Sequence, residues 1–253
     1  GPAPNAPAGN TGDDPSIRFR DFYKDFFRTG TTYQNNISLS GAKDKMNYYF
    51  SASSSKEEGI VPNTNYGRKT FKINANYDVT DNFTIGSSVS YTNSGGRRPN
   101  SGDKSIMSAL SYWSPSIDVN DYIRADGRQK NFTVGTADNP RYLAEVSNLS
   151  DNVDRWIASV NSTWKINNWI KVTYNGSIDN YSDSRNRFAP PDLDVATQVK
   201  GFVINERIRF TGLNSNLLVT FDKRINDDLN NSLTIGNQVD DTETGYDMIR
   251  GEG

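Results

Sequence analysis

The chain has 253 residues, of which only 34% are hydrophobic and yet 11% are aromatic. Disordered chains usually lack aromatic rings, so this composition favours a sheet with one apolar face and one wet face. With a net charge of −2, the chain lacks the excess of positive charge that is typical of nucleic-acid-binding proteins. Histidine and cysteine are both absent, which excludes thiolate chemistry, the Ser-His-Asp triad and His-containing zinc sites. We therefore expect no enzyme, no catalytic residue and no cofactor.

The N-terminal residues 1–20 are rich in Pro, Ala, Gly and Asn, and we predict a loop or linker there. Strands are predicted within residues 21–245, and residues 246–253 are predicted to be a loop. No run approaches the roughly 18 consecutive apolar residues that a membrane helix needs.

The first predicted hairpin runs from Ile37 through a turn near 41–45 to Ala52. The second is stronger, because residues 70–79 alternate strictly between apolar and polar side chains. Its apolar face carries Phe71 and Ile73, and after a tight turn at 80–82 the return strand places Val89 and Tyr91 on one face. Two hairpins are thus expected before residue 95.

A long segment follows at about 95–154, with short helices predicted over 104–113 and near Asn139. The third hairpin then places Val160 and Trp164 opposite Val172 and Tyr174, around a turn at 167–169. A second long segment at about 183–206 precedes a weaker hairpin over 213–239. In total the alternation predicts an all-β antiparallel meander of about eight strands.

Short turns alternate with long loops along the whole chain, as they do in outer-membrane β-barrels. The strongest strands carry about ten alternating residues, close to the 9–11 that cross a bilayer when tilted. We predict that the apolar faces contact lipid, through Phe71, Ile73, Val89, Tyr91, Val160, Trp164, Val172 and Tyr174. The alternative is a soluble extracellular β-sandwich or adhesin-like binding module, in which these residues form a closed core.

Four aromatic residues in the first long loop are candidates for substrate binding: Tyr112, Trp113, Tyr122 and Phe132. Their rings could stack on sugars or on apolar peptide side chains, or they could simply pack the loop against the barrel rim.

Charged residues form three further groups. Asp179, Asp183, Arg185 and Arg187 suggest an ion-pair network at a strand end, with substrate contact as the alternative. The acidic groups 192–194 and 240–243 lack the spaced ligands and glycine of a calcium loop, so we predict solvated loops and no metal site there.

The segments 25–41, 45–52 and 58–60 resemble the start of the barrel in SusC/RagA-like TonB-dependent outer-membrane transporters. In that family a segment ending in Phe-Arg-Thr precedes Asn-x-(Ser or Asn)-(Ile, Val or Leu)-Ser-(Leu or Val)-Ser-Gly, and Glu-Gly-Ile follows the next strand. The corresponding residues here are Phe27-Arg-Thr29, Gln34-Asn-Asn-Ile-Ser-Leu-Ser-Gly41, with Gln in place of the first Asn, and Glu58-Gly-Ile60. The match is specific between about residues 22 and 95; the chain departs from it at 54–56, where the family more often has an aromatic or small apolar residue.

The resemblance implies a plugged barrel of about 22 strands. It implies import of oligosaccharides or peptides across the cell outer membrane of a Gram-negative bacterium, driven through TonB and covered by a SusD-like surface lipoprotein lid. Eight strands cannot close such a wall, and this sequence shows neither a plug domain nor a TonB box. The resemblance therefore implies that the chain is one part of a larger transporter.

Overall fold

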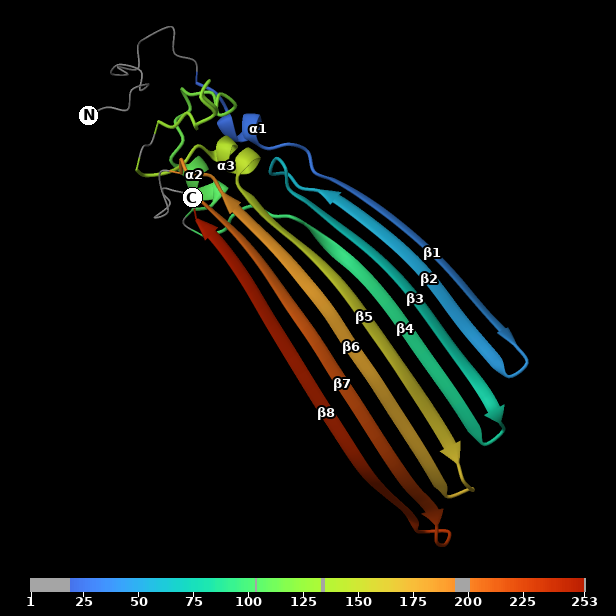
Figure 1. Cartoon of the computed structure of the whole chain (residues 1–253). Helices are drawn as coiled ribbons and strands as arrows, with labels where there is room; N and C mark the ends of the chain where they lie inside the picture. Colours follow the sequence, from blue (N-terminus) through green and yellow to red (C-terminus); the bar gives the residue numbers. More distant parts are fainter. Residues whose placement is uncertain (1–18, 103, 133–134, 194–200, 253) are drawn as a thin grey trace.

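The computed structural model describes residues 19–102, 104–132, 135–193 and 201–252. They form one eight-stranded antiparallel sheet in which every strand pairs with its sequence neighbours, in the order β1-β2-β3-β4-β5-β6-β7-β8 (Figure 1). The strands are β1 (Thr31–Lys43), β2 (Met46–Glu58), β3 (Asn65–Thr80), β4 (Phe83–Arg97), β5 (Asn148–Lys165), β6 (Ile170–Ala189), β7 (Phe202–Arg224) and β8 (Asn230–Glu252). The predicted all-β meander of eight strands is confirmed.

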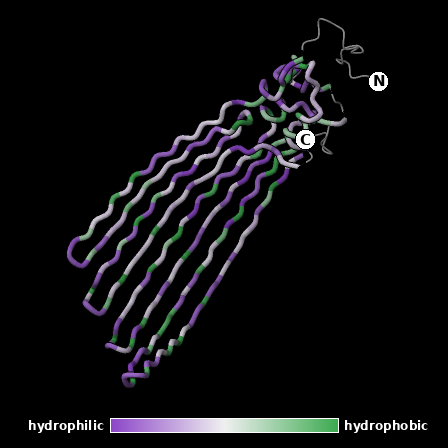
Figure 2. The backbone as a smooth tube through the Cα atoms, turned by 180° about the vertical axis from the view of Figure 1, so that it is seen from behind, coloured by the Kyte–Doolittle hydropathy of each residue, from purple (hydrophilic) through white to green (hydrophobic). Residues whose placement is uncertain are grey.

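Polar and apolar residues alternate along each strand, as Figure 2 shows for the whole sheet. Such alternation sends successive side chains to opposite faces, so the sheet has an apolar face and a polar face. Within the described residues no second strand layer covers either face. The closed core of the β-sandwich alternative is therefore not formed.

All short turns lie at one end of the sheet and all long connections at the other (Figure 1). We call these the turn end and the loop end. The turn at 43–46 contains Asp44, whose positive φ of 53° is a conformation that Asp and Asn tolerate better than most residues. The alternation of loop lengths seen in the sequence thus corresponds to a real polarity of the sheet.

The strands reach further toward the loop end than the sequence pattern predicts. The expected long loops at 95–154 and 183–206 are shortened to 98–147 and 190–201, and the expected loop at 246–253 is strand through Glu252. The physical reason is that polar and charged residues are frequent near the loop end, and apolar residues such as Ile208 and Phe210 lie there on the face opposite to that of Leu213 and Val219. Hydrogen bonding continues there after the regular alternation of the lower strands has been interrupted.

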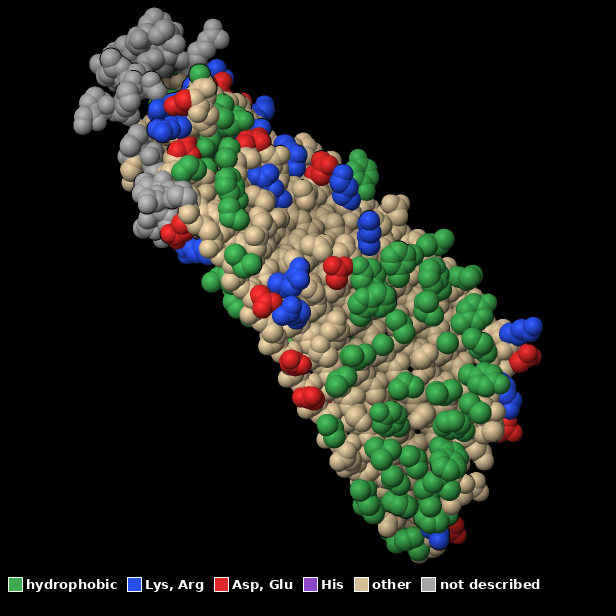
Figure 3. Space-filling view, in the orientation of Figure 1, with side chains coloured by type: hydrophobic (Ala, Val, Ile, Leu, Met, Phe, Trp, Pro, Cys, Tyr) green, Lys and Arg blue, Asp and Glu red, His purple; other side chains and the backbone are tan. Residues whose placement is uncertain are grey.

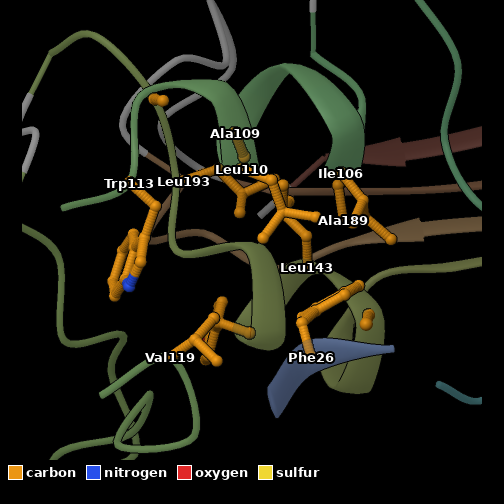
Figure 4. Packing of buried hydrophobic residues seen from close by; sticks show 12 residues of the cluster. Phe26, Ile106, Ala109, Leu110, Trp113, Val119, Leu143, Ala189 and Leu193 are labelled. Carbon is orange, nitrogen blue, oxygen red and sulfur yellow. The ribbon is translucent and has the colours of Figure 1, made fainter. Parts of the chain in front are cut away.

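Three short helices gather at the loop end around a small hydrophobic core: α1 (Phe22–Phe26), α2 (Ile106–Ser111) and α3 (Pro140–Val146). The two helices predicted in the long loop are present. The side chain of Ser105 caps α2 and that of Asn139 caps α3, which also has proline at its first position. Buried side chains from all three helices and from the loop before β7 meet in this core (Figure 4): Phe26, Ile106, Leu110, Trp113, Val119, Leu143, Ala189 and Leu193. We call this unit the loop cluster.

One arginine explains the spacing of the first motifs. Arg28 donates hydrogen bonds from its side chain to the carbonyl oxygens of Gly59 (2.9 Å) and Thr64 (3.0 Å), and its backbone N–H donates to Ile60. Phe26, two residues earlier, is buried in the loop cluster. The Phe-Arg-Thr and Glu-Gly-Ile segments therefore hold the start of β1 against the β2–β3 loop.

Candidate functional site: two faces of a single sheet

The eight residues predicted to face lipid all lie on the apolar face. Phe71 pairs with Tyr91 and Ile73 with Val89 across β3 and β4, and Trp164 pairs with Val172 across β5 and β6. Six of the eight are exposed, by 37–55% of their surface: Phe71, Ile73, Val89, Val160, Trp164 and Tyr174. Tyr91 and Val172 are partly exposed. A space-filling view shows apolar side chains continuous over this face, from the turn end to about mid-strand (Figure 3).

This apolar band crosses the strands obliquely. Its last members toward the loop end are Phe71, Tyr91 and Trp156 on β3–β5, Ile178 and Leu213 on β6 and β7, and Val239 on β8. Between β3 and β8 the border therefore shifts toward the turn end by two positions on the same face, which is a shift of four residues along the strands. With about 3.4 Å per residue and 4.8 Å between strands, this slope corresponds to a tilt of about 30° between the strands and the normal of a flat slab. Strands of outer-membrane barrels tilt by roughly 35–45°.

Aromatic rings lie at both borders of the band. Tyr91 and Trp156 pack with their centroids 4.5 Å apart at the upper border, and the Tyr91 hydroxyl donates a 2.6 Å hydrogen bond to Asp154. At the turn end, the Lys223 ammonium lies 5.4 Å from the centroid of the Trp169 ring. Rings with a polar tip or a polar neighbour suit the level of lipid headgroups.

The polar face is lined by side chains that bond to one another across strands. Ser88 donates to Asn74 at 2.7 Å, Asn76 donates to Asn47 at 3.0 Å, and Thr84 donates to Asp78 at 2.7 Å. Polar groups that form hydrogen bonds in this way suit a hydrated interior. The sheet thus separates an apolar surface from a wet one through a single layer of backbone.

Charged residues join the polar face nearer the loop end. Arg155 donates to Asp179 from two nitrogens, one of them at 2.8 Å, and Arg185 donates to Asp183 at 2.9 and 2.7 Å. The predicted ion-pair network therefore includes Asp179, Asp183 and Arg185. Arg187 lies apart from it, over the ring of Phe202 at 5.9 Å.

The four candidate aromatic residues occupy different environments within the loop cluster. Trp113 is only 4% exposed, donates from its ring nitrogen to the carbonyl of Ile117, and meets Phe132 edge-on at 5.5 Å. Tyr122 and Phe132 are partly buried against the same core. Tyr112 is 55% exposed. Packing accounts for three of the residues, and a ligand-binding role stays a prediction that is best suited to Tyr112.

A polar network joins the two long loops, and no sequence pattern predicts it. Asp192, from the β6–β7 loop, accepts hydrogen bonds from the Tyr142 hydroxyl (2.7 Å) and from the backbone N–H of Gln129 (2.8 Å). The Gln129 side chain donates to Asp138 and to the Asp192 carbonyl, and accepts from the N–H of Asn139. Burial and the adjacent Asp192 raise the pKa of Tyr142 well above its usual range. The hydroxyl therefore remains a donor at physiological pH.

The described members of the two acidic groups considered for calcium do not converge on one point. Asp192 is engaged as above, and Asp194 lies outside the described residues. In the second group, Asp240 accepts from Gln238 on the polar face, while its strand neighbours Asp241 and Glu243 point to the opposite face. No group of three potential acidic, His or Cys ligands occurs in the part of the chain that the structure describes. None of the described helices is long and apolar enough to cross a membrane.

Comparisons with known proteins support the resemblance noted in the sequence. No family model matches the chain. A TonB-dependent receptor P3 of Formosa agariphila is 24% identical over 217 residues, which are 80% of this chain and 21% of the receptor. The structure superposes on that of the RagAB peptide transporter with a TM-score of 0.71 and 16% identity, covering 92% of this chain and 27% of that one.

Two further RagAB structures, of the closed-closed and open-open states of a peptide importer, give the same TM-score of 0.71. The chain spans about a fifth of the length of the curated relative and about a quarter of the matched structures. The predicted fold and the predicted resemblance to SusC/RagA-like transporters are confirmed.

Proposed function

We propose that this chain forms part of the barrel wall of a SusC-like TonB-dependent transporter, which actively imports oligosaccharides or peptides across the outer membrane of a Gram-negative bacterium. The observation that carries the proposal is the apolar band. It is exposed, continuous over all eight strands and oblique to them, on a sheet whose other face is hydrogen-bonding and wet. Lipid hydrocarbon can cover such a band, but an open sheet edge in hydrocarbon would leave backbone N–H and C=O groups without hydrogen bonds. The sheet must therefore close into a barrel.

The open edges of the sheet fit the same proposal. Strands β1 and β8 each pair on one side only, so each presents a row of free backbone groups. In a barrel further strands of the same protein complete both edges. The names of the relatives, a TonB-dependent receptor and a peptide transporter, agree with energised import rather than with an enzymatic reaction.

Two partners follow from the proposal: TonB on the turn-end side and a SusD-like lipoprotein lid on the loop-end side. Exposed apolar side chains on the loop cluster support a protein contact there, among them Met107 (53% exposed), Tyr112 (55%) and Ile123 (42%). If Tyr112 contacts the lid, Tyr112→Glu weakens its co-purification. If Tyr112 contacts substrate instead, Tyr112→Ala lowers substrate affinity and leaves the lid bound.

The test is energy-dependent uptake by the full-length protein in its outer membrane. Cells carrying it should accumulate labelled oligosaccharide or peptide, and accumulation should stop when the proton gradient is collapsed or TonB is deleted. The protein should fractionate with outer membranes and migrate faster on unheated gels. Recovery as a water-soluble secreted protein, with no change in uptake on its deletion, would refute the proposal.

A further inference from the structure

The polar face changes character along β5–β8. Toward the turn end a cross-strand row consists of amides: Asn161 pairs with Asn175, Asn175 with Asn216, and Asn216 with Gln238. Nearer the loop end, on the same face, stand apolar and aromatic side chains: Ile157, Tyr181, Ile208, Phe210, Tyr246 and Met248. We call these six residues the inner patch. They lie on the wet face and so cannot belong to the lipid-facing band.

The inner patch consists of a stacked pair of rings with exposed side chains beside it. Tyr181 and Phe210 stack with centroids 5.1 Å apart and ring planes 18° apart, and the Arg155 guanidinium lies 6.0 Å from the Tyr181 ring centroid. Tyr246 and Met248, by contrast, are 56% and 53% exposed. A stacked aromatic platform with the exposed ring of Tyr246 and the flexible side chain of Met248 beside it offers a ligand a place to bury apolar surface.

The charges around the inner patch are unevenly neutralised. Arg155 and Arg185 are each committed to a neighbouring aspartate by two hydrogen bonds. Glu206 pairs in register with Arg185, but its hydrogen bond comes from the neutral Tyr246 hydroxyl at 3.0 Å. Among the described residues Glu206 forms no ion pair. The patch therefore presents a carboxylate next to exposed apolar groups, while its guanidinium groups are already occupied.

We infer that the inner patch binds a peptide segment that carries a cationic group, a lysine or arginine side chain or an N-terminal ammonium, next to an apolar side chain. The cation pairs with Glu206, and the apolar side chain lies on Tyr246, Met248 and Ile208. A neutral sugar has no cationic group to pair with Glu206, whereas a peptide can carry both a cationic group and apolar side chains. This inference rests on the proposed transport function and selects peptide as its substrate class.

The rim of the face favours one orientation of such a peptide. One register step nearer the loop end, Arg187 and Arg250 lie over the ring of Phe202 at 5.9 and 5.7 Å. Arg250 is also paired with Glu252 at 2.5 Å, whereas Arg187 forms no ion pair among the described residues. The rim therefore keeps one unpaired cation, Arg187, next to a patch whose unpaired charge is the carboxylate of Glu206. A bound peptide would point its cationic group toward Glu206 and its carboxylate end toward the rim.

The experiment measures binding to the full-length transporter in detergent by calorimetry. The probes are three synthetic pentapeptides of matched apolar content with lysine, glutamine or glutamate at the central position, and a neutral oligosaccharide. We expect the lysine peptide to bind most tightly and the glutamate peptide least. In Glu206→Gln the advantage of lysine over glutamine should fall about tenfold, as expected for the loss of one close charge pair. Glu243→Gln removes a carboxylate from the opposite face of the sheet and should change nothing.

The outcomes separate this inference from the proposed function. Equal affinity for all three peptides in the wild-type protein, which needs no variant, would overturn the inference while energy-dependent uptake still supported transport. Binding of the oligosaccharide alone, weakened by Tyr246→Ala, would overturn peptide as the class. If the transport test itself fails, with no uptake and no membrane insertion, the proposed function falls and the inference falls with it.

Discussion

A side chain's direction, more than its type, decides its environment in this sheet. Val89 and Ser88 are neighbours in β4, yet Val89 lies in the apolar band and Ser88 donates a hydrogen bond to Asn74 on the polar face. This alternation could be predicted from the sequence, because a strand leaves only two directions for a side chain. In the loop cluster no such rule applies. Tyr112 is exposed and its neighbour Trp113 is buried, and an irregular segment gives no period from which to predict that difference.

Lysine substitutions test the two faces directly. We expect Val89→Lys and Val160→Lys, in the middle of the band, to destabilise the barrel in a bilayer by about 2–4 kcal/mol, because a charge then enters hydrocarbon. Ser88→Lys and Asn161→Lys are matched controls on the polar face and should cost little. The measurement is urea-induced unfolding in phospholipid vesicles, and similar losses on both faces would argue against lipid contact.

Tyr142 supports a prediction of pH dependence. Because burial and Asp192 raise the pKa of its hydroxyl, the protonated form stabilises the folded loop cluster. That stabilisation is fully present below the unfolded value of about 10 and is lost only as the pH rises toward the higher folded value. Limited proteolysis of the loops should therefore be constant from about pH 6 to 9 and accelerate only in stronger alkali. The Tyr142→Phe variant should be cut faster than the wild type by a similar factor from about pH 6 to 9, and this difference should shrink in stronger alkali. A transition near neutrality would contradict the assignment.

At the scale of the element, the strands extend beyond the apolar/polar alternation from which they were predicted. β7 has 23 residues, but its alternation of band residues covers only Leu213 to Phe221. The hairpins, the short turns and the two helices of the long loop could be predicted, since each has a local signal. The upper halves of β6–β8 could not, because polar residues outnumber apolar ones there and several apolar residues, such as Ile208 and Phe210, change to the other face. Both features interrupt the hydrophobic period on which the prediction depends.

Hydrogen exchange distinguishes strand from loop in this upper region. The backbone of Phe202 pairs with Ala189 on one side and Glu252 on the other, so the ladder continues to the end of β7. We expect amides of 202–211 in the full-length protein to exchange as slowly as those of 213–221. The segment 59–64, which has no ladder, serves as a fast-exchanging control. Exchange of 202–211 within seconds would show that the beginning of this segment is a loop, as the sequence predicted for 183–206.

Over the whole molecule, the oblique band specifies how the sheet sits in a membrane. The border of the band slopes by about 30° relative to the rows of paired residues, as expected if the strands are tilted in a flat membrane. The two rings Trp156 and Trp164 mark opposite borders of the band, whereas Trp113 lies in the core of the loop cluster. The complete barrel, by contrast, could be anticipated only from the family resemblance, because closure depends on strands outside this chain.

Depth-dependent quenching by brominated lipids checks this placement. In single-tryptophan variants of the full-length protein, Trp156 and Trp164 should both be quenched most by bromines near the headgroups, since both lie at borders. Trp113 should be unaffected by bromines at any depth. Strong quenching of Trp113, or no quenching of Trp156 and Trp164, would contradict the proposed placement of the sheet in the bilayer.

The upper halves of the long strands extend beyond the apolar band, so lipid around the proposed barrel would not constrain their outer face. On that face, exchange of one polar side chain for another would keep the backbone hydrogen bonds and disturb no lipid contact. In the proposed barrel, the outer surface above the apolar band can therefore vary in sequence, whereas the band itself must stay apolar to remain in contact with lipid.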